Sequence, residues 1–145
     1  MKRLVLDMDE VSDQFLDDAR LLGVVTDWKP YQLCWALNHH YGYQFRTEPG
    51  AEIVKYHKQR SYHFTLHRHR HTQQRYEHFI YLNKDDGLFL MPEFNHIDFL
   101  WMIKGDWATY DLQQTVQQQL TSLPAVRMVT ELSKAKIKNR DHLLV

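Results

Sequence analysis

Residues 97–104 constrain the fold most, because they predict a strand with apolar side chains on both faces. In an extended chain, alternate side chains point to opposite sides. One side would carry Ile97, Phe99, Trp101 and Ile103, and the other Leu100 and Met102. A strand that is apolar on both faces is covered on both faces, as at the centre of a packed sheet. The stretch Ile97–Lys104 therefore predicts a central strand with other elements packed above and below it.

The rest of the chain predicts further strands joined by short connections. They are expected at Leu4–Met8, Leu21–Thr26, Ser61–Arg70, Arg75–Asn83, Leu88–Met91 and Val126–Leu132, with a β-rich middle that begins at Tyr43–Glu48. Lys84-Asp85-Asp86-Gly87 has the Asp-Gly sequence of a hairpin turn. Short connections favour antiparallel pairing, so we predict an α+β fold with a largely antiparallel sheet of about six to eight strands. A profilin-like or longin-like layout is the expected topology.

Two stretches change to the helical period and should pack on this sheet. The first begins at Trp28, with Asp27 as the expected N-cap, Pro30 in the first turn and Gly42 at the end. Its apolar face would contain Leu33, Cys34, Leu37 and Tyr41.

The second helix is expected at about Trp107–Leu123, after a cap at Gly105-Asp106 and before Pro124. Its apolar stripe is narrow and contains Leu112, Val116, Leu120 and Leu123. The glutamines at 113, 114, 117, 118 and 119 would form a solvated face. After the last strand, residues 134–145 form a basic tail with an apolar tip that could dock on the domain.

Composition indicates one ordinary cytoplasmic domain over residues 1–145. Apolar residues make up 43% of the chain, and 18 basic residues balance 18 acidic ones. Cys34 is the single cysteine, so an internal disulfide is excluded. The first residues lack the apolar core of a signal peptide, and no apolar run approaches the length of about 20 residues that crosses a membrane. We therefore expect neither a membrane association nor a bound cofactor.

The segment between two of the predicted strands contains Pro92, Glu93, His96 and Asp98. Proline cannot donate to a strand ladder, so Pro92 should close the strand before it. Glu93 and Asp98 can accept backbone N–H bonds from the tight connection. Alternatively, the two carboxylates and His96 could perform acid–base chemistry or hold a divalent ion. We favour the structural role, because no phosphate loop, nucleophile elbow or zinc-binding helix motif accompanies these residues.

The same segment, Met91-Pro92-Glu93-Phe94-Asn95-His96-Ile97-Asp98-Phe99, resembles the signature of the bacterial IPExxxVDY family. Pro92, Glu93 and Asp98 match the named letters, whereas Phe99 stands where the family has tyrosine. Three other stretches resemble family segments: Tyr31–Asn38, Phe99–Gly105 and Lys138–Val145. The family has no assigned activity, cofactor or substrate, so the resemblance implies a fold and no reaction. A phenylalanine in place of the tyrosine is easier to reconcile with packing than with chemistry.

A histidine-rich stretch lies in the middle of the chain. If the strand alternates through it, His63, His67, His69 and His71 share one face. Neighbouring imidazoles on one face can bind zinc, copper or nickel. However, no cysteine or acid lies in the segment to complete a ligand set. Solvated histidines at a strand end or hairpin tip are the simpler interpretation, and Cys34 is interpreted as an inert core thiol.

The surrounding residues 53–76 contain six basic residues and no acid. Basic side chains can contact phosphates while aromatic rings stack on bases. The candidate nucleic-acid contacts are Lys55, Lys58, Arg60, Tyr62, Arg68, Arg70 and Arg75, interleaved with Tyr56, Phe64 and Tyr76. The neutral charge of the whole chain weakens this hypothesis, because the acidic N-terminal region could pair with these bases.

Three functions remain after these exclusions. We favour a non-catalytic module that binds a protein partner or a second copy of itself, because surplus aromatic residues can form an exposed patch that marks an interface. Gly105, Pro92, Glu93 and Asp98 would then be structural residues. The alternatives are an RNA or single-stranded nucleic-acid binding protein that uses residues 55–76, and a metal-assisted enzyme that uses Glu93, His96 and Asp98.

Overall fold

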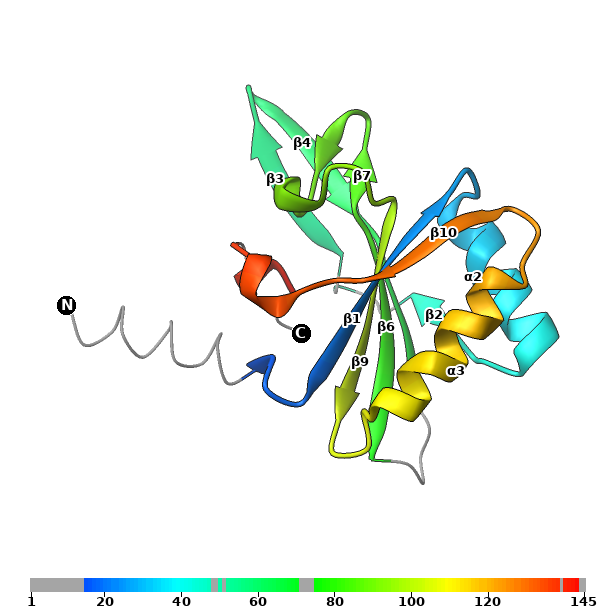
Figure 1. The fold of residues 1–145 in the computed structure, drawn as a ribbon. Helices are drawn as coiled ribbons and strands as arrows, with labels where there is room; N and C mark the ends of the chain where they lie inside the picture. Colours follow the sequence, from blue (N-terminus) through cyan, green and yellow to red (C-terminus); the bar gives the residue numbers. More distant parts are fainter. Residues whose placement is uncertain (1–14, 48–49, 51, 71–74, 139, 144–145) are drawn as a thin grey trace.

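The computed structural model describes residues 15–47, 50, 52–70, 75–138 and 140–143, and these form an α+β fold as predicted. The main sheet is antiparallel and has six strands (Figure 1). Its order is β10 (Val126–Glu131), β1 (Ala19–Thr26), β9 (Phe99–Gly105), β6 (Tyr76–Leu82), β5 (Leu66–Arg70) and β2 (Arg46–Thr47). The strand expected at Leu4–Met8 lies outside the described residues.

Two hairpins and two helices complete the described fold. One hairpin joins β3 (Ile53–His57) to β4 (Arg60–Phe64), and the other joins β7 (Lys84–Asp85) to β8 (Leu88–Phe89). The helices are α2 (Pro30–Tyr41) and α3 (Tyr110–Thr121), and short 3-10 turns occur at Pro92–Phe94, Lys134–Lys136 and Arg140–Leu143. The turn at residues 84–87 is a hairpin turn as expected. Asp86 and Gly87 both have positive φ, 46° and 86°, which suits the tight turns preferred between antiparallel strands.

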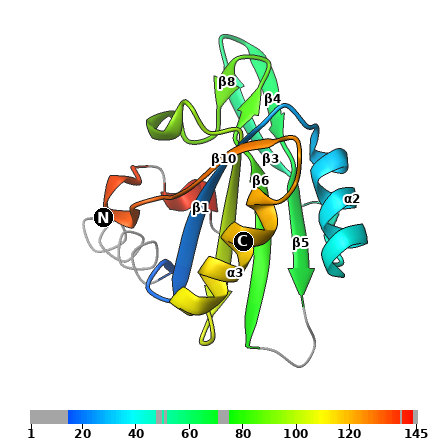
Figure 2. The same ribbon diagram turned by 45° about the vertical axis from the view of Figure 1, so that its right-hand side comes forward.

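Strand β9 lies at the centre of the sheet and is buried on both faces, as the sequence predicted. Each residue from Phe99 to Ile103 is at most 2% exposed. Trp101 and Ile103 pack with α2 and α3, whereas Leu100 and Met102 pack with the C-terminal segment and the connection before β9. Figure 2 shows the helices on one side of the sheet and the C-terminal turns on the other. The prediction that Ile97 faces the same side as Trp101 is wrong. Ile97 precedes β9 and packs with Leu100 and Met102.

Both helices begin later than expected, at Pro30 and Tyr110. Lys29, and not Asp27, is the N-cap of α2, and its N–H donates to Gln32 Oε1 at 2.8 Å. Asp27 instead accepts from Arg127 Nη2 at 2.6 Å, a partner far away in the sequence. Helix α2 ends at Gly42 in the left-handed conformation, as predicted. Tyr41, expected on the buried face, is exposed.

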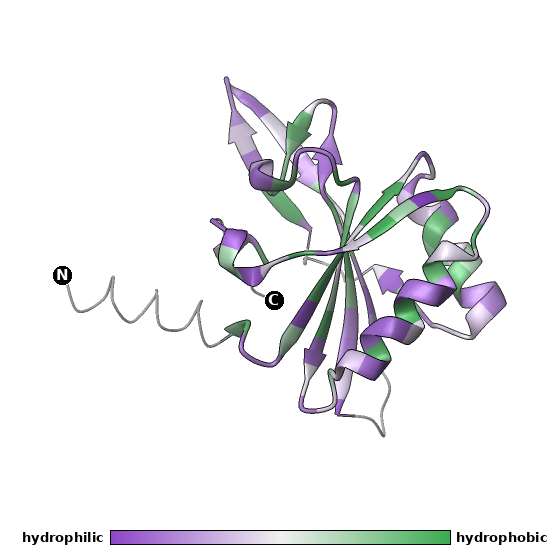
Figure 3. Ribbon diagram, in the orientation of Figure 1, coloured by the Kyte–Doolittle hydropathy of each residue, from purple (hydrophilic) through white to green (hydrophobic). Residues whose placement is uncertain are grey.

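Helix α3 is capped by Thr109, whose Oγ1 accepts from Leu112 N at 3.2 Å. Asp106 therefore belongs to the preceding turn. Gly105 ends β9, has a φ of 137° and lies against the backbone of Arg75. The glutamine face is only partly solvated. Gln118 is exposed, Gln114, Gln117 and Gln119 are half-buried, and Gln113 is 1% exposed and accepts from Arg20 Nη1 at 3.2 Å. Purple and green alternate along α3 in Figure 3, as expected of an amphipathic helix.

The strand predicted at Ser61–Arg70 is two strands, which was not foreseen. It breaks at Thr65, so that β4 belongs to the outer hairpin and β5 to the main sheet. The described part of the tail packs on the sheet face away from the helices. There Ile137 and Leu143 are buried, and the Tyr81 hydroxyl donates to Leu143 O at 2.8 Å.

Candidate functional site

Glu93 and Asp98, the two carboxylates of residues 91–99, bond to separate parts of the backbone. Glu93 Oε2 accepts from Lys138 N at 2.5 Å, so Glu93 holds the C-terminal tail, whereas the sequence predicted that it would bond within its own connection. Asp98 Oδ2 accepts from Thr26 N at 3.0 Å, where β1 ends. His96 is exposed. Each carboxylate therefore holds the backbone of a distant segment, at Lys138 or at Thr26, near the start of β9. This is a structural role.

Asn83 is the residue that organises this segment, and sequence reasoning missed it. Its side chain is fully buried and makes three hydrogen bonds. Asn83 Nδ2 donates to Phe94 O at 3.0 Å and to Ile97 O at 2.9 Å, and Oδ1 accepts from Met91 N at 2.8 Å. One amide thus bonds three backbone groups of the connection. Phe94 O also accepts from Ile97 N at 3.1 Å, whereas Ile97 O and Met91 N depend on Asn83.

The four histidines do not all share a face as predicted, because the chain changes sheets at Thr65 and only His67 and His69 alternate on the same strand. His63 is on β4, whereas His67 and His69 are on β5, and His71 lies outside the described residues. His69 Nδ1 accepts from Gln44 N at 2.8 Å. Across the described part of the chain, no three His, Cys, Asp or Glu side chains are placed to hold a metal ion, and this includes the set Glu93, His96 and Asp98.

The proposed nucleic-acid residues are divided between two sheets, and three of the arginines bond to acids. Arg60 pairs with Asp86 on the β7–β8 hairpin. Arg68 and Arg70 both pair with Glu77 on β6.

Other members of this set are also engaged or displaced from a common surface. Lys55 Nζ donates to Phe89 O at 3.2 Å, and Arg75 lies 6.0 Å from the ring centroid of Trp107. Arg60 also lies 4.9 Å from the ring centroid of Tyr62. Phe64 is fully buried, and Lys58 occupies the turn between β3 and β4 with a φ of 51°. The segment therefore does not present its basic and aromatic side chains on one open face.

Two other reactive side chains are sealed in the core on the helix side. Burial raises the pKa of the Cys34 thiol to about 12, which makes it a poor nucleophile. His78 is 2% exposed, and its Nδ1 accepts from Trp101 Nε1 at 3.0 Å. Burial, helped by the neighbouring His69, lowers the pKa of His78 to about 3. The imidazole is therefore neutral at physiological pH and packs as part of an aromatic cluster with Tyr43 and Phe45.

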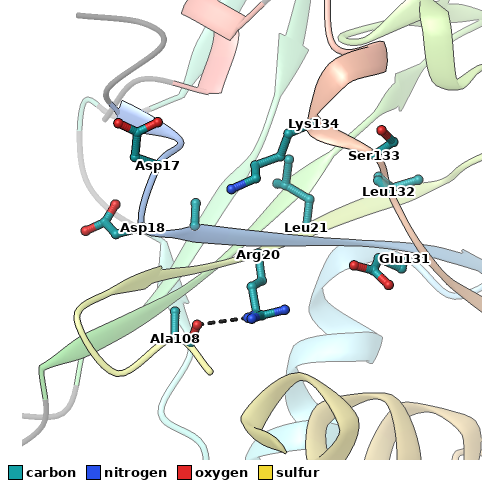
Figure 4. A pocket seen from close by; sticks show the side chains of 10 residues that line it. Asp17, Asp18, Arg20, Leu21, Ala108, Glu131, Leu132, Ser133 and Lys134 are labelled. Atoms are coloured by element: carbon teal, nitrogen blue, oxygen red, sulfur yellow. Dashed lines mark hydrogen bonds between the residues drawn. The ribbon is translucent and has the colours of Figure 1, made fainter. Parts of the chain in front are cut away.

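A polar cavity of about 540 Å³ lies where β10 leaves the edge of β1 (Figure 4). Arg20 crosses it below β1 and donates from Nε to Ala108 O at 2.9 Å. Lys134 lies above the strand and donates from Nζ to Leu16 O at 2.9 Å. The two cations thus bond to carbonyl groups of the protein itself, which is a structural use of their charge.

A second cavity, of about 560 Å³, has the opposite character and lies along the outer side of α2. We call it the α2 groove, and its lining residues are Trp28, Tyr31, Gln32, Trp35, Ala36, His40 and Pro124. Tyr31 is 69% exposed and Trp35 is 63% exposed, whereas Leu33 and Leu37 on the inner side of the helix are fully buried. The α3–β10 connection, which passes beside α2 in Figure 1, supplies Pro124 as the opposite wall.

Part of the α2 groove, the helix face that contains Tyr31 and Trp35, can be recognised in the sequence. Tyr31 and Trp35 are four residues apart and therefore share a helix face, and Leu33 and Leu37 are on another face. We expected an exposed aromatic patch without locating it. Pro124 could not be placed beside α2 from local sequence, because only the packing of both helices on one sheet face brings it there.

No family model, curated protein or solved structure matches this chain. Among the described residues, no helix is both long and apolar enough to cross a membrane. The functional argument therefore depends on the geometry of the described side chains.

Proposed function

We propose that this protein is a non-catalytic interaction module that binds a protein partner through the α2 groove. The observation that carries the proposal is the exposure of Tyr31 and Trp35 beside Trp28 and Pro124. Large aromatic side chains dominate the binding energy of protein interfaces. Tyr31 and Trp35 together expose roughly 300 Å² of surface. Its burial would contribute about 7 kcal/mol before the entropic costs of association.

The groove lies on a helix that is anchored in the core, which lowers the cost of binding. Leu33 and Leu37 anchor α2 in the core, so the opposite side of the helix has a fixed position. The Trp35 ring stacks on His39 with their centroids 4.8 Å apart and an interplanar angle of 11°. A ring that is already held in place loses little freedom when a partner covers it.

The other candidate sites support binding over catalysis. The Glu93 and Asp98 carboxylates accept backbone N–H bonds, and the Cys34 thiol is buried with a raised pKa. The basic residues proposed for RNA binding include three arginines that pair with Asp86 or Glu77. The carboxylates and the three arginines thus have structural partners and the thiol is buried, whereas Tyr31 and Trp35 are 69% and 63% exposed.

Site-specific photocrosslinking tests the proposal in cells of the source organism. A p-benzoylphenylalanine in place of His40, on the wall of the groove, should form an adduct with a specific protein. The same group in place of Met128, which is exposed on β10, serves as the control. Equal crosslinking from both positions, or adducts with nucleic acid only, would contradict the proposal.

The purified partner then tests the role of the aromatic rings. We expect Trp35→Ala to weaken its binding at least tenfold, which corresponds to about 1.4 kcal/mol or more, because the ring is an interface anchor. Tyr56→Ala is the matched control, since Tyr56 is 78% exposed on the separate β3–β4 hairpin. Both variants should keep the wild-type free energy of unfolding within about 0.5 kcal/mol, as measured by urea denaturation. Equal affinities of the two variants would contradict the assignment.

A further inference from the structure

We infer that the α2 groove binds a proline-rich segment of its partner in the extended polyproline II conformation. This inference rests on the proposed function and specifies the chemistry of the partner. Three properties of the groove lead to it: its small aromatic area, its lack of charge, and its excess of hydrogen-bond donors over acceptors.

The area of the groove favours a peptide segment over a folded domain or a second copy of the chain. Even with part of Trp28 and Pro124 included, the aromatic surface amounts to roughly 400 Å². A stable interface between folded proteins buries about 800 Å² on each partner. A short segment that lies in the groove can be covered on one side by this smaller surface.

The lining also excludes charged partners. None of its seven described residues is an acid, a lysine or an arginine. Asp27, which precedes the lining residue Trp28, is paired, because Arg127 Nη2 donates to Asp27 Oδ1 at 2.6 Å. A phosphorylated, acidic or strongly basic segment would lose its hydration there without gaining a countercharge. The complementary ligand is therefore uncharged and apolar.

The polar atoms of the groove are mainly donors. Gln32 Oε1 already accepts from Lys29 N, which leaves the Gln32 amide nitrogen to donate. No described residue accepts a hydrogen bond from the Trp35 indole or the Tyr31 hydroxyl. A ligand that fits this set supplies carbonyl oxygens and needs few acceptors in return.

Of the common peptide conformations, polyproline II meets this requirement best. Its carbonyl groups make no internal hydrogen bonds, and proline has no backbone N–H to satisfy. An α-helical ligand has its backbone carbonyls already bonded, so it would leave the groove donors unpaired. An added β-strand needs a sheet edge with alternating donors and acceptors, which the side of α2 does not provide.

The inference is tested with an uncharged, capped peptide of about ten prolines, a length that forms a stable polyproline II helix. Saturable binding to the full-length protein should appear as a change in tryptophan fluorescence. Trp35→Ala should weaken it at least tenfold and Tyr56→Ala should leave it unchanged. A glycine-serine peptide of equal length and an uncharged amphipathic helical peptide should not bind.

The outcomes separate this inference from the proposed function. If the crosslinked partner binds at the α2 groove but millimolar polyproline does not, the proline-rich assignment is wrong and the interaction site stands. The proline-rich assignment is also wrong if the crosslinked segment of the partner is helical or charged, or if the helical peptide binds more tightly than polyproline. If neither the partner nor polyproline depends on Trp35, both proposals fail.

Discussion

Replacement of Asn83 by alanine is expected to lower the free energy of unfolding by about 2–6 kcal/mol, because two buried backbone groups lose their partner and each costs about 1–3 kcal/mol. The two groups are Ile97 O and Met91 N, whereas Phe94 O keeps its bond from Ile97 N. Urea denaturation followed by tryptophan fluorescence measures the change. A loss of this size is a large part of the stability of an ordinary domain, so a variant that is unfolded without urea also agrees with the prediction.

Asn95→Ala is the matched control for this variant. Asn95 lies in the same connection but is exposed, so its replacement should change the free energy of unfolding by no more than about 0.5 kcal/mol. Asn83→Asp should also be strongly destabilising, since it keeps an acceptor for Met91 N but removes both donated bonds. A loss of less than about 1 kcal/mol in Asn83→Ala would show that the connection does not depend on this amide.

Acidification is expected to destabilise the protein through His78, by about 2 kcal/mol between pH 7.5 and pH 5. Burial lowers the pKa of the folded His78 to about 3, whereas the unfolded chain has the ordinary value of 6.5. Below pH 6.5 the unfolded state therefore binds a proton that the folded state excludes. The contribution of His78 is fully present above pH 6.5 and is lost progressively as the pH falls toward 3.

His78→Asn isolates this effect from the other histidines. The Asn side-chain oxygen can replace Nδ1 as the acceptor for Trp101 Nε1, but it does not titrate in this range. The variant should be less stable at pH 7.5 because of imperfect packing, yet lose about 2 kcal/mol less than the wild type on going to pH 5. The pKa of His67 is also lowered by burial. This adds the same dependence of the free energy of unfolding on pH to both proteins. Equal losses in the two proteins would contradict the role of His78.

The parts of the fold that were predictable depend on local patterns. Apolar residues on both faces identified β9 as a central strand, and Asp86-Gly87 identified a hairpin turn. The errors occur where distant residues compete for local groups. Asp27 pairs with Arg127 and does not cap α2, and the buried Gln113 bonds to Arg20.

The candidate site was predictable to a smaller extent, for the same reason. A role for Asp98 as a backbone acceptor could be inferred from its place before β9, but its donor, Thr26 N, could not. Asn83 has no local signal, because its three bonds reach residues 91 to 97. In the α2 groove, the spacing of Tyr31 and Trp35 is a local signal, whereas Pro124 becomes a wall only through tertiary packing.

The central claim is that the α2 groove, and not residues 91–99 or the basic residues 55–76, is the binding surface. A backbone-amide NMR titration of the full-length protein with the crosslinked partner tests it most directly. The predicted result is that chemical-shift changes concentrate at residues 28–40 and around Pro124, with little change at Glu93, His96 and Asp98. Changes concentrated at residues 93–98 or 55–76, with the groove unaffected, would contradict the claim.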